Sequence, residues 1–240
     1  MTEQLYRADA YLRECEARVI DVNERGGIVL DKTPFYASAG GQPGDRGRLQ
    51  FAGGDCPIAT TVYDQADKAR IVHVAAENAP RPVAGDTVTA VLDWEQRHRH
   101  MRMHTALHIL CSLVPFPVTG GQIGPDESRL DFDIEDASSV DKDRLTIDLN
   151  ALVAADHPVS ERWISDAELE ANPGLVRTMS VKPPMGTGRV RLVLIGEGGA
   201  IDMQPCGGTH VRSTAEIGRL AISKIEKKGK INRRIRVVLA

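Results

Sequence analysis

Aromatic residues and cysteines are scarce in this chain: Phe, Trp and Tyr make up 4% of its 240 residues, and four residues are cysteines. The cysteines are too widely spaced for a disulfide framework, so we expect reduced thiols, one of which can serve as a metal ligand. No segment approaches the roughly 18 consecutive apolar residues of a membrane-spanning helix. Residues 1–19 have neither the apolar stretch nor the cleavage site of a signal peptide. These absences predict a cytoplasmic protein that does not enter a membrane.

The composition predicts a globular protein with one strongly basic segment. Hydrophobic residues make up 42% of the chain and charged residues 26%, which allows a sizeable core. The formal net charge is −3, but the last 21 residues hold a single acid, Glu226, against seven bases: Lys224, Lys227, Lys228, Lys230, Arg233, Arg234 and Arg236. A basic patch on an acidic body indicates an anionic partner such as nucleic acid. A solvated basic edge strand without a partner is the alternative.

The first 92 residues have the pattern of a small β-barrel domain. Short apolar runs separated by Gly and Pro predict strands at 17–22, 26–31, 46–51, 58–64, 70–75 and 86–93. The segment NERGG, residues 23–27, is typical of a hairpin loop because its glycines tolerate a positive φ. The longer loop at 32–47, KTPFYASAGGQPGDRG, is glycine-rich, which suits close approach of the backbone to a ligand or a structural loop.

Residues 93–240 predict a second, α+β domain. Helical periodicity begins at Trp94 and runs to about residue 112, and a second helix is expected between residue 141 and Pro158. The segment SDAE at 165–168 is a capping box that opens a short helix. Strands are expected at 189–195, 200–204, 218–226 and 234–239. The fold class is therefore α+β, with a barrel domain at 1–92 and a domain containing an antiparallel sheet at 93–240.

Two pairs of metal-ligand residues are the chemical signal in the second domain. His104 and His108 lie one helical turn apart, about 6 Å, so both imidazoles can reach one ion. Cys206 and His210 flank a tight glycine turn in the segment CGGTH. Three imidazoles and one thiolate suit tetrahedral Zn²⁺, so we expect one zinc ion per chain.

Several alternatives remain open around this site. His100 could replace His108 as the partner of His104, since it lies one turn earlier. A metalloprotease is excluded because Thr105 stands where the general base Glu would follow the first His. Asp202 is either a partner of a ligand imidazole or a solvated acid at the end of a strand. We expect the remaining polar residues of the helix start to face solvent or phosphate: Arg97, His98, Arg99, His100 and Arg102.

The motifs in combination resemble those of a known family. HTALHIL at 104–110, CGGTHVRSTAEIG at 206–218 and GKINRRIRV at 229–237 are similar to the editing domain of alanyl-tRNA synthetase and to the free-standing AlaX proteins. The glycine-rich loop at 32–47 resembles the corresponding segment of the longer AlaX class. The resemblance implies hydrolysis, in trans, of tRNA(Ala) wrongly charged chiefly with serine, with glycine as a second candidate.

The resemblance also implies roles for individual residues. The zinc ligands would be His104, His108, Cys206 and His210. Two further residues would line the pocket for the amino acid, namely Thr33, which matches a residue that recognises the seryl hydroxyl, and Gln122, in VTGGQIG. The paired glycines Gly40 and Gly41 would lie near the tRNA end, and the basic side chains Lys227, Lys228, Arg233 and Arg234 would contact acceptor-stem phosphates.

The residues leave three functional interpretations open. The first is the deacylase, with the acceptor end of tRNA(Ala) as its partner and no obligatory protein partner. The second is a tRNA-binding accessory module with a structural zinc, and the third is another zinc-dependent esterase or amidase. The sequence names no general base, and it leaves open whether three or four residues bind the metal. The scarcity of aromatics argues against extensive base stacking in any of these.

Overall fold

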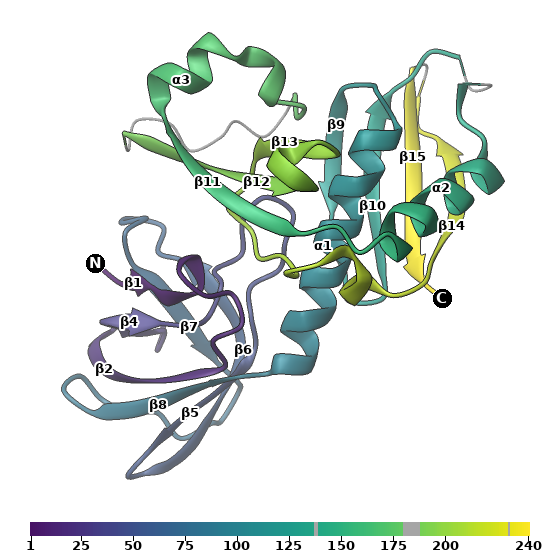
Figure 1. Ribbon diagram of the computed structural model, residues 1–240. Helices are drawn as coiled ribbons and strands as arrows, with labels where there is room; N and C mark the ends of the chain where they lie inside the picture. Colours follow the sequence, from purple (N-terminus) through teal and green to yellow (C-terminus); the bar gives the residue numbers. More distant parts are fainter. Residues whose placement is uncertain (137–138, 180–187, 230) are drawn as a thin grey trace. The chain divides into compact units, whose positions relative to one another are not determined.

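The computed structural model describes residues 1–136, 139–179, 188–229 and 231–240 (Figure 1). The chain divides into two compact units, Met1–Arg99 and His100–Ala240. Helix α1 (Trp94–Leu113) begins in the first unit and continues into the second. Within the described residues, no helix has both the length and the apolar character needed to cross a membrane.

The first unit is a closed antiparallel barrel, as the sequence predicts. Its strands follow the order β2 (Glu14–Val22), β3 (Ile28–Leu30), β7 (Ile71–Ala75), β6 (Gly54–Tyr63), β5 (Gly47–Phe51) and β8 (Thr87–Leu92). A short parallel pair, β1 (Glu3–Gln4) with β4 (Lys32–Thr33), and a 3₁₀ turn at Leu5–Arg7 accompany it. Gly26, in the predicted hairpin loop between β2 and β3, has φ of 74°, a conformation that favours glycine.

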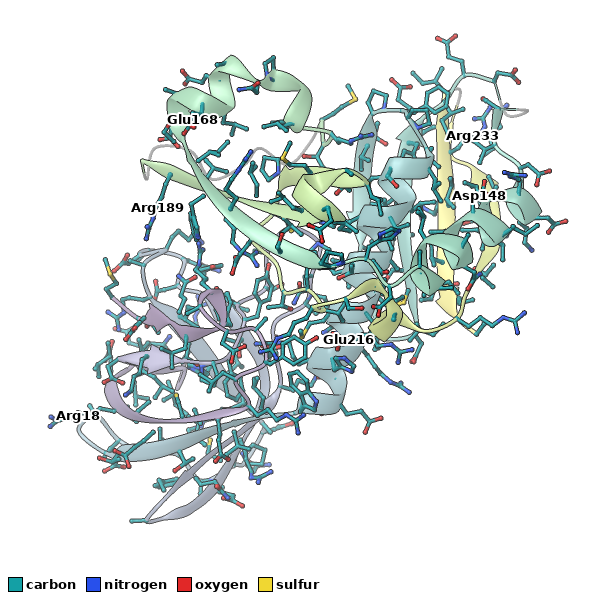
Figure 2. All side chains as sticks on the ribbon, viewed as in Figure 1. Arg18, Asp148, Glu168, Arg189, Glu216 and Arg233 are labelled. Atoms are coloured by element: carbon teal, nitrogen blue, oxygen red, sulfur yellow. The ribbon has the colours of Figure 1, made fainter. Side chains whose placement is uncertain are left out.

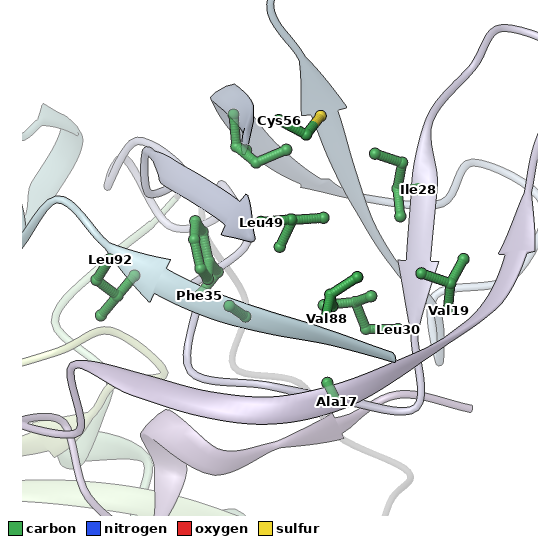
Figure 3. Packing of buried hydrophobic residues seen from close by; sticks show 11 residues of the cluster. Ala17, Val19, Ile28, Leu30, Phe35, Leu49, Cys56, Val88 and Leu92 are labelled. Carbon is green, nitrogen blue, oxygen red and sulfur yellow. The ribbon is translucent and has the colours of Figure 1, made fainter. Parts of the chain in front are cut away.

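Alternation of apolar and polar residues explains why the barrel closes around a single core. Successive side chains of a strand point to opposite faces, so every second residue of β2 and β8 can face inward. Val19, Leu30, Leu49 and Val88 are buried together with Phe35 from the loop that follows β4, as Figure 3 shows. Each aliphatic side chain buried in this way contributes about 1.5–3 kcal/mol relative to exposure.

Arg97 corrects one expectation from the sequence. We expected this side chain to face solvent or phosphate, but it is fully buried in the first unit. Its Nε lies 3.0 and 2.9 Å from the two carboxylate oxygens of Asp45, and it also donates to the carbonyls of Ala10 and Pro34. Local basicity suggested a surface, but the partner carboxylate comes from a distant part of the chain. The same expectation is wrong for His100, which is 1% exposed.

The second unit contains two antiparallel sheets. The larger has the order β14 (Leu220–Lys227), β15 (Asn232–Leu239), β10 (Glu127–Asp133) and β9 (Val118–Gln122). Helix α2 (Lys142–Ala154) covers β14 through its buried Leu145, Leu149 and Val153, and Asn150 exchanges hydrogen bonds with the backbone of Leu220. The part of α1 in this unit is buried on several sides, which makes it a central helix.

The smaller sheet immediately precedes the segment that contains Cys206 and His210. Its order is β11 (Val159–Ser165), β12 (Arg189–Ile195) and β13 (Asp202–Pro205). Helix α3 (Asp166–Ala171) follows β11, and the capping box predicted at Ser165 and Glu168 is present. Short 3₁₀ turns occupy Pro173–Leu175, Glu197–Gly199 and Thr214–Ile217. The α+β class is confirmed, whereas the sequence did not predict β9, β10 or β11.

Candidate metal centre

Four side chains from two distant segments converge in the second unit. The ligand atoms of His104, His108, Cys206 and His210 all lie within 4.8 Å of one another. The Sγ of Cys206 is 3.4 Å from Nε2 of His104 and 3.3 Å from Nε2 of His210. Tetrahedral zinc with usual Zn–S and Zn–N lengths separates S and N ligands by about 3.5 Å. The spacing and the donor types therefore fit one zinc ion.

Helix geometry and a glycine turn bring these atoms together. His104 and His108 project from successive turns of α1, with ring centroids 5.3 Å apart. The ring of His210 lies 4.2 Å from that of His104 and 4.7 Å from that of His108. The cluster of possible ligand atoms contains His108 and not His100, which favours His108 as the partner of His104.

The loop after β13 is held by an arginine that the sequence analysis did not identify. Arg191 Nη1 donates to the carbonyl oxygens of Cys206 and Gly208, at 3.0 and 2.9 Å. The amide of Cys206 donates in turn to the Arg191 carbonyl at 3.1 Å, and that of Gly208 points to the Cys206 sulfur at 3.4 Å. Arg191 also pairs with Glu161 of β11. The turn that contains Cys206 is thus held to β12 by both the side chain and the backbone carbonyl of Arg191.

Two polar residues contact the Nδ1 atoms of imidazoles in the cluster. Asp202 Oδ2 lies 2.8 Å from Nδ1 of His108 and accepts a second hydrogen bond, 2.9 Å long, from Gln204 Nε2. This contact makes Asp202 a buried partner of an imidazole, not a solvated acid. The hydroxyl of Thr105 lies 3.1 Å from Nδ1 of His210. The sequence pattern did not predict the contact between Thr105 and His210.

The electrostatics of the cluster favour a thiolate. Burial raises the pKa of the Cys206 thiol, but its interactions with the neighbouring imidazoles of His104 and His210 outweigh this effect, and the pKa is well below the ordinary value. Burial lowers the pKa of His108, but hydrogen bonds and charges of Asp202 and Cys206 raise it to about 10 overall. Cysteine binds a metal cation as the thiolate, so this environment favours the form of Cys206 that can act as a ligand.

Sequence comparisons agree with this arrangement. Residues 190–236 match the profile of the threonyl and alanyl tRNA synthetase second additional domain, and residues 10–96 match class II (A) tRNA synthetases. An alanyl-tRNA editing protein AlaX-M of Methanosarcina acetivorans is 37% identical over 245 aligned positions, covering 98% of each chain. The chain belongs to the AlaX family. An AlaX-M protein of Saccharolobus solfataricus is 33% identical over 98% of each chain. An AlaX-L protein of Pyrococcus horikoshii is 33% identical, covering 96% of this chain and 56% of its own.

Two features that the AlaX resemblance singled out lie in the first unit. The hydroxyl of Thr33 is buried, 2.8 Å from Nε2 of His73, and accepts from the amide of Phe35 at 3.1 Å. Gly40 and Gly41 are exposed, with φ of 56° and 83°, at the tip of a tight turn. Consecutive positive φ values suit a type I′ turn, which explains the paired glycines structurally. The roles of Thr33 and of the glycines toward tRNA stay predictions.

The predicted phosphate contacts of the AlaX chain occupy different environments. Lys227 and Lys228 are exposed at the end of β14. Arg233, near the start of β15 (Figure 2), is 6% exposed and donates to the carbonyl of Glu135. Arg234 forms two hydrogen bonds with the carboxylate of Asp131. Lys230 lies outside the described residues. The two lysines are therefore the best placed of the set to meet a phosphate.

Gln122 ends β9 at the edge of the larger sheet. It is exposed, and its Oε1 lies 3.4 Å from Nε of Arg129, its partner in register on β10. A carboxamide in this position can donate or accept a hydrogen bond toward a ligand. Its place in the amino-acid pocket stays a prediction.

Proposed function

We propose that this chain is a zinc-dependent deacylase that chiefly releases serine from wrongly charged tRNA(Ala), with glycine as a second candidate substrate. The convergence of the His104, His108, Cys206 and His210 ligand atoms within 4.8 Å carries the proposal. Those four residues come from the motifs that the sequence shares with the AlaX family. The reaction adds water across the ester between the amino acid and the terminal ribose, which yields the free amino acid and uncharged tRNA.

Family membership supports the coarser part of the proposal. The relatives that align with this chain from end to end are named alanyl-tRNA editing proteins, and editing of that kind makes the chain a hydrolase of an aminoacyl ester. The choice of serine and glycine, the zinc ion and the pocket residues go beyond those names and are part of our proposal.

The residues of the cluster can perform two tasks around a metal. Cys206 supplies negative charge to the ligand set, and Asp202 holds the imidazole of His108 through its Nδ1. A bound zinc ion would supply positive charge to polarise an ester carbonyl or to lower the pKa of water. The ligand residues themselves are occupied in this arrangement, so the general base has to come from elsewhere.

Discrimination between serine and alanine requires a polar contact with the extra hydroxyl. A site whose polar groups await a hydroxyl disfavours the analogue without it, by factors that can reach about 10⁴. Thr33 and Gln122 are the residues we propose for this contact. The Thr33 hydroxyl is fully buried, with its proton directed at His73 and one lone pair taken by the amide of Phe35. The carboxamide of Gln122 is exposed, so Gln122 is the better placed of the two to contact a seryl hydroxyl.

The decisive assay measures release of labelled serine from Ser-tRNA(Ala) by zinc-loaded protein, with Ala-tRNA(Ala) as the matched substrate. The proposal predicts rapid release of serine and little release of alanine. Gly-tRNA(Ala) in a parallel reaction gives the relative preference. Absence of serine release by folded, metal-replete protein would contradict the proposal.

One observation favours the structural alternative, in which the zinc only stabilises the fold. The four donor atoms all lie close to one another, and a zinc held by four protein ligands is typical of a closed structural site. Cys206→Ala separates the two functions. A structural ion predicts that the variant unfolds its second unit, whereas the deacylase predicts a folded protein that loses activity. Circular dichroism and serine release are measured on the same sample.

A further inference from the structure

Thr105 occupies an unusual position among the residues around the metal cluster. It lies on α1 between His104 and His108, is fully buried, and makes three contacts through one oxygen. Its Oγ1 lies 2.9 Å from the carbonyl of Met101, 3.1 Å from Nδ1 of His210 and 3.3 Å from the amide of Val211. The sequence showed only that this residue is not the acid of a metalloprotease.

The hydrogen-bonding capacity of a hydroxyl fixes the direction of each contact. A hydroxyl has one proton to donate and two lone pairs to accept with. The Met101 carbonyl can only accept, so Thr105 donates its single hydrogen bond to that carbonyl. The Val211 amide can only donate, so it uses one lone pair. The second lone pair is left for His210, whose Nδ1 must then carry a proton.

This assignment determines which nitrogen of His210 is available to a metal. A neutral imidazole carries one proton, so a protonated Nδ1 leaves Nε2 bare. The same Nε2 lies 3.3 Å from the Cys206 sulfur, on the side of the cluster. Because Thr105 is fully buried, bulk water cannot replace its hydroxyl as the acceptor of the Nδ1 proton.

We propose that Thr105 is a positioning residue of the metal centre. Its hydroxyl accepts a hydrogen bond from the protonated Nδ1 of His210, and this contact orients the unprotonated Nε2 of His210 toward Cys206 and His104. The inference rests on the zinc ion of the proposed function. The Nδ1 atoms of two imidazoles of the cluster thus have different hydrogen-bond partners: the carboxylate of Asp202 for His108 and the hydroxyl of Thr105 for His210. Outer contacts of this kind typically change metal affinity by about 10–100-fold.

The test compares Thr105→Val, which keeps the shape and removes the hydroxyl, with Thr105→Ser, which keeps the hydroxyl. Zinc affinity is measured by competition with a chromophoric chelator, and circular dichroism of the metal-free proteins checks the fold. We expect Thr105→Val to bind zinc at least about 10-fold more weakly than the wild type and Thr105→Ser to stay within about threefold. Cobalt substitution gives a second readout, because a displaced imidazole changes the visible absorption of a tetrahedral Co²⁺ site.

A double-mutant cycle separates positioning from a general structural role. If Thr105 acts through His210, Thr105→Val produces no further loss of zinc affinity in a His210→Ala background. An equal loss in both backgrounds, or wild-type affinity and an unchanged cobalt spectrum for Thr105→Val alone, overturns the inference and leaves the proposed function standing. A wild-type chain that binds no zinc overturns the zinc part of the proposed function and this inference with it.

Discussion

The hydroxyl of Thr33 donates a 2.8 Å hydrogen bond to Nε2 of His73 inside the barrel unit. The direction follows from the other ring nitrogen, since Nδ1 lies 3.1 Å from the carbonyl oxygen of Ile28, which can only accept. Because burial lowers its pKa, His73 is neutral near pH 7, and its single proton is on Nδ1. Its burial lowers the pKa of His73 from 6.5 to about 4.

This buried imidazole predicts that the barrel loses stability in mild acid. The unfolded chain binds the His73 proton below about pH 6.5, whereas the folded chain binds it only below about pH 4. The free energy of unfolding contributed by this residue is thus complete above pH 6.5 and falls as the pH decreases toward 4. The difference amounts to about 3 kcal/mol. Urea unfolding between pH 7.5 and 4.5 measures most of it.

His73→Asn is the variant that isolates this contribution, because a carboxamide can still donate to Ile28 but does not titrate. Trp163→Phe in both proteins leaves Trp94 as the one tryptophan, so fluorescence reports the unit that contains residue 73. Subtracting the two pH profiles cancels the titration of carboxylates. Parallel pH profiles for the chains with and without His73→Asn would refute the prediction.

The buried pair of Arg97 and Asp45 predicts a large loss of stability when either partner is removed alone. Arg97→Met leaves the Asp45 carboxylate buried, with the backbone amide of Tyr36 as one remaining donor. Breaking a buried pair in this way costs about 3–5 kcal/mol, because the remaining charge has lost its counter-ion. Arg97→Met with Asp45→Leu should recover part of that loss. Urea midpoints of the single and double variants provide the measurement.

Arg70 and Asp21 provide the matched control for that prediction. They form an ion pair in the same unit, but their side chains are 29% and 44% exposed. Solvent screens an exposed pair, so Arg70→Met should cost less than about 1 kcal/mol. Equal costs for Arg70→Met and Arg97→Met would mean that burial does not determine the strength of these interactions.

The sequence predicted the barrel better than the second unit, for physical reasons. Each of the six barrel strands shows enough alternation or apolar content to be recognised, and turns rich in glycine separate several of them. Strand β9 contains Gly120 and Gly121, and β11 exposes most of its side chains, so neither has a strand's usual pattern. These two strands are specified by their neighbours, with which they pair in register.

The site divides in the same way between local and distant information. The spacing of His104 and His108 is a property of one helix, and CGGTH is a property of one turn, so both could be recognised in the sequence. The contacts of Asp202 with His108 and of Thr105 with His210 join segments that are far apart in the chain. Burial of a charged side chain depends equally on a distant partner, which local sequence does not reveal.

Asp202→Asn predicts a weaker metal centre in a protein that keeps its fold. The carboxamide has the shape of the carboxylate, but it removes the charge that faces Nδ1 of His108. We expect zinc affinity to fall by about 10–100-fold, the range found for outer contacts of ligand histidines. Asp143→Asn, on the exposed first turn of α2, removes the same charge away from the cluster and should leave zinc affinity unchanged. Chelator competition compares the two variants, and equal affinities would show that Asp202 does not support the centre.

Lys227 and Lys228 predict the salt dependence of tRNA binding. Both side chains are exposed, whereas Arg233 is buried and Arg234 is paired with Asp131, so the lysines are the cleaner test of the predicted phosphate contacts. Each phosphate contact adds close to one to the slope of log affinity against log salt. Neutralising both lysines to Gln should reduce that slope by about 2 and weaken binding similarly for every tRNA sequence.

The control for the lysine variant removes the same charge elsewhere. Lys68→Gln with Lys142→Gln neutralises two exposed lysines outside the basic segment and should keep the wild-type slope. Filter binding of tRNA(Ala) measures both slopes. Between roughly 50 and 200 mM salt, the affinity of the control double variant should fall about tenfold more than that of the Lys227 and Lys228 double variant. If neutralising Lys227 and Lys228 changes neither the slope nor the rate of serine release, the basic segment does not bind the tRNA. That result would favour the remaining alternative, a zinc-dependent esterase or amidase with a small substrate, because such an enzyme has no need of a phosphate-binding surface.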